Sequence, residues 1–279
     1  MAFFDGQDED LSFGRRKERP TGTLTICARC DATGAYGIAT LSGHMAAGAY
    51  VGAVRQKTGA AAVQGAFNPY LKFQVLGGLL ARKGADLALK EALDEDERSA
   101  DSQVLVVAEG GVSAAKTGDR VPSWGGHMIG ENYAIGGTGL EVEGVVDIMA
   151  DCFLASARTG RDLADRMIDV LAAGLNALGQ TGRERSACLS VSGPGPIPHL
   201  DLRVDDDKAP LDRLRTLYTD YMEDDARVDR FLATPEAPEG RIPTQLDEAL
   251  IYLRRHWLHF RKGKLARNKT EDKRKAANR

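Results

Sequence analysis

The order of the predicted elements limits the possible folds most: strands come in adjacent pairs, and helices come in pairs between them. Residues 23–29 alternate apolar and polar side chains, which is typical of a half-buried strand. Residues 31–34 have the chemistry of a turn, and residues 36–41 follow as a return strand. A second hairpin is predicted from the strands at 103–108 and 112–116. Strands joined by such short turns pair antiparallel.

The predicted helices form two pairs. Residues 70–93 have a helical pattern that Gly84 divides in two, and residues 142–157 and 163–178 form two amphipathic helices. Further elements are strands at 59–64, 186–192 and 200–204 and a helix at 211–221. Two helix pairs need two sheet faces to cover, and the alternation of a parallel sheet is absent. The sequence therefore predicts an α+β fold, a four-layer α-β-β-α sandwich with antiparallel sheets.

We divide the chain into three parts. Residues 1–22 are a polar N-terminal extension and a candidate propeptide, and residues 23–222 form the sandwich domain. Residues 223–279 form a proline-containing linker and a basic helical tail, with a helix expected at 245–259. A basic helix end can contact nucleic acid, but we favour a solvated tail or a contact between copies in a homo-oligomer.

Composition gives no argument for a nucleic-acid or membrane partner. The 279 residues carry 37 basic and 40 acidic side chains, a net charge of −3. No apolar run approaches the roughly 20 residues that span a bilayer, and the acidic N-terminus lacks the features of a signal peptide. The four cysteines are few and scattered, so we expect reduced thiols and a cytoplasmic protein.

Several familiar site patterns are missing or incomplete. Cys27 and Cys30 form a C-x-x-C without the second ligand pair that a zinc site needs, and the five histidines have no metal-ligand spacing. The glycines at 136–139 lack the lysine of a phosphate-binding loop, so we interpret them as a tight turn. No metal or cofactor is expected.

The junction between Gly22 and Thr23 is a candidate for catalysis. A threonine that opens a buried strand can act as a nucleophile if its own amino group is free, because that amine, with a pKa of roughly 8, takes the hydroxyl proton. The bond before Thr23 must then be cut. The alternative is an ordinary strand threonine, since Gly-Thr is a common dipeptide.

The sequence resembles the Ntn-hydrolase-like proteins of the family named domain of unknown function 1028. The matching stretches are TLTICAR (23–29), GIATLS (37–42), QGAFNP (64–69), WGGHMIGENYA (124–134), RSACL (185–189) and LDLRVDD (200–206). The last is the most specific, because a strand ending in DLRVDD has no generic structural explanation.

The resemblance implies the four-layer sandwich and the hydrolysis of an amide bond in a small amide or peptide-like substrate. Two family features are absent here: Ser42-Gly43 stands in place of a Ser-Lys pair, and Gly136-Gly137-Thr138 in place of Q-G-N. The chain therefore lacks a cation and a side-chain amide, and a donor to an oxyanion is worth about 3 kcal/mol.

These considerations define seven candidate site residues. Thr23 is the expected nucleophile and base, and Asn68, Gln64 and His127 are expected to position the substrate, stabilise the oxyanion or orient a neighbour.

Ser42, Arg29 and Arg203 are expected to bind substrate, the arginines through a carboxylate. Two alternatives stay open: a salt bridge from Arg203 to Asp205 or Asp206, and a purely structural loop histidine at position 127. The competing function is a non-catalytic scaffold or binding protein that keeps Thr23 internal and assembles through its tail.

Overall fold

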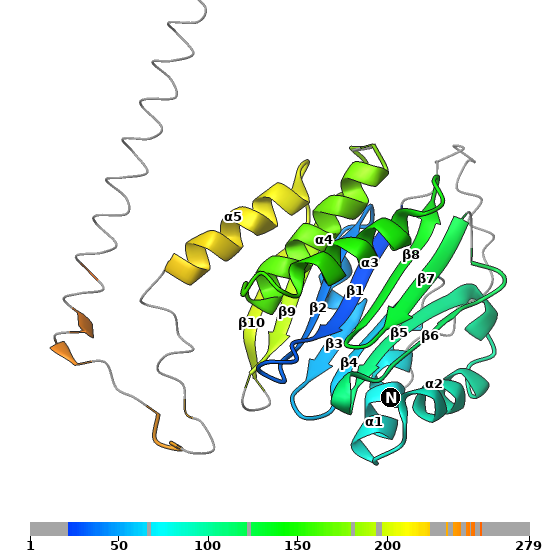
Figure 1. Ribbon diagram of the computed structural model, residues 1–279, viewed down its shortest axis with the longest axis horizontal. Coiled ribbons are helices and arrows are strands. Elements are labelled where there is room, and N and C mark those ends of the chain that lie inside the picture. The colour runs from blue at the N-terminus through cyan, green and yellow to red at the C-terminus, as the bar shows by residue number, and fades with distance from the viewer. Residues whose placement is uncertain are drawn as a thin grey trace, which may run out of the picture.

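The structure is a computed structural model that describes residues 22–65, 68–121, 124–179, 182–193, 197–223 and a few positions between 233 and 252. The described part contains two antiparallel sheets and five α-helices (Figure 1). The helix expected at 245–259 lies almost entirely outside the described residues. No helix in the described ranges is long and apolar enough to cross a membrane.

The larger sheet has six strands in the order β10-β9-β2-β1-β8-β7. Its strands, in chain order, are β1 (Thr23–Arg29), β2 (Tyr36–Ser42), β7 (Trp124–Gly130), β8 (Tyr133–Leu140), β9 (Ser186–Ser192) and β10 (Pro198–Val204). The smaller sheet has four strands in the order β3-β4-β5-β6. These are β3 (Gly52–Arg55), β4 (Gly59–Gly65), β5 (Ser102–Ala108) and β6 (Ser113–Thr117).

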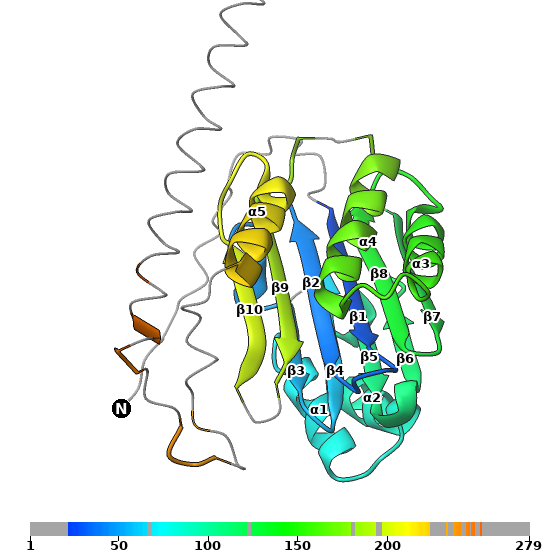
Figure 2. The same ribbon diagram turned by 60° about the vertical axis from the view of Figure 1, so that its left-hand side comes forward.

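The helices cover the two outer faces. Three of them, α3 (Val145–Ser156), α4 (Leu163–Ala177) and α5 (Pro210–Glu223), pack on the larger sheet. The other two, α1 (Leu71–Leu80) and α2 (Ala85–Asp94), pack on the smaller sheet. Figure 2 shows α3, α4 and α5 in front of the larger sheet, with the smaller sheet behind it. The predicted α+β sandwich with antiparallel sheets is confirmed.

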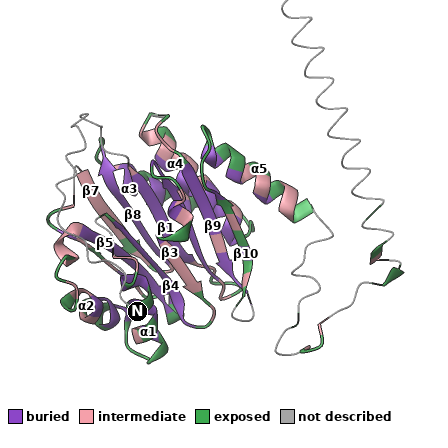
Figure 3. Ribbon diagram, turned by 180° about the vertical axis from the view of Figure 1, so that it is seen from behind, coloured by how far each residue is buried: buried purple, intermediate pink, exposed green. Residues whose placement is uncertain are grey.

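The alternation in β1 sets which side chains enter which layer. Leu24 and Ile26 pack toward the helices, where burial of each side chain contributes roughly 1.5–3 kcal/mol. Cys27 belongs to the apolar cluster between the two sheets, and Thr23 and Thr25 lie on the same face because strand side chains alternate. The central strands are buried along most of their length (Figure 3). One end of the layer between the sheets is therefore polar.

Three details differ from the prediction, and the first is that strand β7 was not predicted. The glycines at 136–139 are part of strand β8 and do not form a turn, because Gly136 and Gly137 pair with Thr25 and Leu24 of β1. The four-residue strand β3 was not predicted, since it is too short to give a periodic signal. The remaining predicted strands and helices are found within a few residues of their expected ends.

Candidate functional site

Thr23 and Ser42 face each other at the start of β1. The hairpin register pairs them, and Oγ1 of Thr23 lies 2.8 Å from Oγ of Ser42. Only 6% of Thr23 and 1% of Ser42 are exposed. Oγ of Ser42 also accepts a hydrogen bond from the backbone N–H of His44 at 3.1 Å. A serine hydroxyl accepts two hydrogen bonds, so Ser42 has a lone pair left for the hydroxyl proton of Thr23.

Hydroxyl side chains continue across the larger sheet on both sides of this pair. Thr138 of β8 pairs with Thr23, and Ser186 of β9 pairs with Ser42. Oγ of Ser186 donates to the carbonyl oxygen of His44 at 2.6 Å and accepts from the N–H of Ala47 at 3.2 Å. Four neighbouring strands thus present a row of hydroxyls at the end of the sheet where the chain enters β1.

Gly22, the residue before the strand, is held in the same ladder. Its carbonyl oxygen accepts a hydrogen bond from the N–H of Gly43 at 3.0 Å. A Cβ at Gly22 would lie 3.1 Å from Cδ2 of Leu140, which is a tight contact. The peptide bond that must be cut to free Thr23 therefore has an N–H donor on its carbonyl oxygen.

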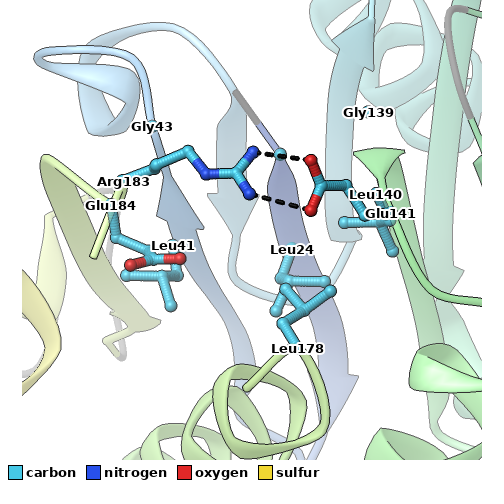
Figure 4. A pocket seen from close by; sticks show the side chains of 10 residues that line it. Leu24, Leu41, Gly43, Gly139, Leu140, Glu141, Leu178, Arg183 and Glu184 are labelled. Atoms are coloured by element: carbon cyan, nitrogen blue, oxygen red, sulfur yellow. Dashed lines mark hydrogen bonds and ion pairs between the residues drawn. The ribbon is translucent and has the colours of Figure 1, made fainter. Parts of the chain in front are cut away.

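A small cavity of about 20 Å³ lies beside Gly22 on the helix side of the sheet. Figure 4 shows Leu24, Leu41 and Leu178 on one side and the Arg183–Glu141 ion pair across the other. This pair has two hydrogen bonds of 3.0 and 2.8 Å. The cavity has room for about one water molecule and not for a substrate.

A second row of polar side chains begins at Thr25, two residues after Thr23 on the same face of β1. Oγ1 of Thr25 lies 3.0 Å from Oγ1 of Thr40 and donates to Oε1 of Gln64 at 2.7 Å. Nε2 of Gln64 then donates to Oε1 of Gln103 at 2.6 Å. Because Gln64 and Gln103 belong to the smaller sheet, the chain of hydrogen bonds crosses the layer between the sheets.

Gln103 fixes the direction of this network. The two protons of its Nε2 are shared among three acceptors: the carbonyl oxygens of Gly126 and Gly137 at 2.9 and 3.2 Å, and Oγ1 of Thr117 at 2.7 Å. Carbonyl oxygens only accept, so the amide nitrogen must face them and Oε1 must face Gln64. The amide of Gln64 is oriented in turn, with its oxygen toward Thr25.

His127 ends the network. Its Nδ1 lies 2.7 Å from Oγ1 of Thr117. Because Thr117 accepts from Gln103, its own proton is available to a neutral imidazole that carries its hydrogen on Nε2. Burial and the nearby charge of Lys116 lower the pKa of His127, which favours this neutral form. Donors and acceptors then run in one direction from Thr25 to His127.

The other three predicted site residues lie elsewhere. Arg29 is at the far end of β1, where its Nη1 binds Asp31 and Asn132 at 3.0 Å each. Six residues of strand separate it from Thr23, or about 20 Å. The side chain of Asn68 accepts from the N–H of Tyr70 at 3.1 Å, in the turn before α1.

Arg203 pairs with Asp205 at 2.8 Å, the alternative that the sequence left open. Counting strands from β1 to β10 places it about 14 Å across the sheet from Thr25. The structure thus brings together Thr23 and Ser42, with Gln64 and His127 linked to the neighbouring Thr25, while Arg29 and Arg203 lie apart from them.

The sequence patterns did not identify Thr25, Thr40, Gln103 or Thr117 as site residues. A signal existed in β1, where hydroxyl residues recur with a period of two on the face that does not carry leucine and isoleucine. Gln103 gave none, because a glutamine at the start of an apolar strand is usually solvated.

The described cysteines and acidic residues do not form a metal site. No group of three or more His, Cys, Asp or Glu residues in the described ranges is arranged to hold a metal ion. Cys27 and Cys30 are not joined in a disulfide. Burial raises the pKa of the Cys27 thiol far above its ordinary value, so this thiol stays protonated and unreactive.

Comparison with known proteins agrees with this architecture. The chain is similar to the crystal structure of protein SPO2555 from Silicibacter pomeroyi, described as a DUF1028 protein, with a TM-score of 0.73 and 25% identity. The match covers 79% of this chain and 99% of that one. A comparison with curated proteins gives no match. The sequence profile of a family of unknown function, DUF1028, matches residues 23–214, from the first residue of β1 into α5. The chain therefore belongs to the DUF1028 family of unknown function.

Proposed function

We propose that this protein hydrolyses an amide bond in a small or peptide-like substrate, with Thr23 as an N-terminal nucleophile. The observation that carries the proposal is the position of Thr23: it opens β1, its hydroxyl is bonded to Ser42, and the carbonyl before it has a donor. The family match also begins at residue 23, which sets residues 1–22 apart from the shared domain.

Maturation begins with attack of Oγ1 of Thr23 on the carbonyl carbon of Gly22. The C–N bond breaks, the nitrogen of Thr23 takes up the hydroxyl proton, and residues 1–22 become an ester on Oγ1. Water then hydrolyses the ester and frees the amine and the hydroxyl. The N–H of Gly43, 3.0 Å from the attacked carbonyl oxygen, stabilises the negative charge that develops on it.

The mature site repeats this chemistry on a substrate. The free amine of Thr23 takes the proton from Oγ1, which attacks the amide carbon, and the departing amine takes that proton. Water hydrolyses the resulting ester. The hydrogen bond that Thr23 donates to Ser42 fixes the rotamer of Thr23, which is why Ser42 is a positioning residue in this scheme.

The activity test uses four proteins and a panel of amides and dipeptides. Wild type is expected to hydrolyse at least one compound, Thr23→Ala none, and Thr23→Ser, which keeps a hydroxyl, the same compound at a reduced rate. Thr219→Ala removes a hydroxyl on the exposed part of α5 and serves as the matched control. Equal activity of Thr23→Ala and wild type would contradict the proposal.

A non-catalytic scaffold is the second candidate, and the cavity beside Gly22 favours it. With the Gly22–Thr23 bond intact, the space there is about 20 Å³, and both residues are tied into the sheet. In that case the chain stays full length, and no variant of Thr23 changes a measured hydrolysis rate.

A further inference from the structure

The larger sheet extends past the edge of the smaller one. It has six strands against four, and β3, the edge strand of the smaller sheet, lies over β2 and β9, so β10 extends beyond it. The side chains of Leu200 and Val204 are buried under the helices. The alternate residues Asp201 and Arg203 face the other way and are exposed. This strip of the inner face is therefore open to ligands.

A cavity of about 200 Å³ lies at this overhang. Its floor includes Ile38, Cys188, Ser190 and Asp201, and its roof includes Gly48 and Gly52. A Cβ at Gly52 would lie 2.3 Å from Cδ1 of Ile38, and one at Gly48 would lie 2.7 Å from Cβ of Cys188. Because neither glycine has a side chain, the backbone at Gly48 and Gly52 packs directly on Cys188 and Ile38, and these contacts set the shape of the cavity.

Two polar side chains of the floor have no protein partner. Ser190 and Asp201 are paired across β9 and β10. Neither side chain makes a hydrogen bond or ion pair with another residue in the described ranges. Asp201 is exposed as a residue, but partial desolvation raises the pKa of its carboxyl, while the charge of Arg203 acts in the opposite direction.

A positive charge lies at one end of the same floor. A Cβ on the roof residue Gly48 would lie 3.3 Å from Nε of Arg203, so the guanidinium borders the cavity. Nε and Nη2 of Arg203 bind Asp205 at 3.3 and 2.8 Å, which leaves Nη1. Arg203 and Asp201 are two residues apart on one strand face, or about 6.6 Å.

We propose that this cavity binds a small zwitterion of the α-amino-acid type. Its ammonium group binds Asp201 and Ser190, its carboxylate binds Nη1 of Arg203, and its side chain packs on Ile38 and Val54. A ligand with only an amine leaves Arg203 without a partner group, and a ligand with only a carboxylate leaves Asp201 without one. The site is separate from Thr23, which lies three strands away behind the loop that carries Ala47, so it does not rest on the proposed hydrolysis.

The test compares three ligands that share one side chain: L-valine, isobutylamine, which lacks the carboxylate, and isovalerate, which lacks the amine. Binding to the full chain is followed by saturation-transfer NMR. L-valine is expected to bind at least about tenfold more tightly than either fragment, because each fragment loses one charge-assisted contact. Absence of valine binding up to about 10 mM, or equal binding of a fragment, would overturn the proposal.

Variants locate the ligand. Asp201→Asn is expected to weaken valine binding about tenfold and to leave isovalerate unchanged, and Ser190→Ala to weaken valine binding by a smaller factor. Asp147→Asn, at an exposed position of α3, is the matched control and should bind as wild type does. Thr23→Ala should also bind valine normally. If Thr23→Ala abolishes binding, or Asp201→Asn has no effect, the ligand lies elsewhere and the assignment is wrong.

Discussion

Gln103 fills the space that a side chain at position 136 would need: a Cβ at Gly136 would lie 2.2 Å from Oε1 of Gln103. The amide from the smaller sheet thus lies directly over a glycine of the larger one. This contact explains the glycine at position 136 of β8, which is a buried central strand. It also places a side-chain amide in the layer between the sheets, on a strand where no site residue was predicted.

Gly136→Ala should therefore destabilise the protein strongly. The added methyl group must displace Gln103, so overpacking of about 1–3 kcal/mol combines with the loss of buried hydrogen bonds. Urea unfolding measures the change. Gly77→Ala on the exposed face of α1 is the control, because a Cβ there meets nothing within 4 Å and alanine favours helix by about 0.8–1 kcal/mol. Similar stability changes for both variants would contradict the contact.

Gln64 and Gln103 should be energetically coupled. Replacing either by leucine leaves the amide of the other buried without its partner, at a cost of about 1–3 kcal/mol. The double variant removes both groups, so its destabilisation should be smaller than the sum of the single ones, with a coupling energy of about 0.5–3 kcal/mol. Urea unfolding of wild type and the three variants gives this value. If the destabilisations of the two single variants add up to that of the double variant, the hydrogen bond between the two amides does not contribute to stability.

His127 should make stability depend on pH. Its pKa is lowered in the folded protein, so the unfolded chain binds the proton more readily near and below pH 6.5. The contribution is fully present above pH 6.5 and is lost as pH falls through the folded pKa. In His127→Asn the free energy of unfolding should fall less between pH 7 and pH 5 than in wild type. Thr219→Ala, which removes an exposed hydroxyl of α5, is the control and should keep the wild-type dependence.

Lys72 should act in the alkaline range. Only 2% of this residue is exposed, its amine donates to the carbonyl oxygen of Tyr50, and burial lowers its pKa. Its contribution to stability is fully present above the unfolded pKa of about 10.4 and is lost as pH falls through the folded pKa. Wild type should gain stability relative to Lys72→Met between pH 7 and pH 10. The same comparison with the exposed Lys208→Met should show no such gain.

Much of the fold could be predicted because it depends on local signals. Turn residues at 31–34 centre the first hairpin, and a hairpin centred there pairs Thr23 with Ser42. The pairing of Thr23 with Ser42 can therefore be predicted from the position of the turn alone.

The network from Thr25 to His127 is different, because Gln64 meets Thr25 only when the two sheets pack. The requirement for glycine at position 136 likewise comes from Gln103, 33 positions earlier in the chain, and no local pattern predicts this contact. The same reason separates Arg203 from Thr23: the order of strands, with two of them between β1 and β10, is a property of the sheet.

Thr23 must become an N-terminus for the proposed chemistry, and intact-mass spectrometry of the purified full-length chain measures whether it does. Wild type should appear as a species that lacks residues 1–22, together with the released segment. Thr23→Ala should keep its full mass under the same conditions, and Thr219→Ala should be processed as wild type is. A wild-type protein that stays at full mass, or a Thr23→Ala variant that loses the same residues, would contradict the account.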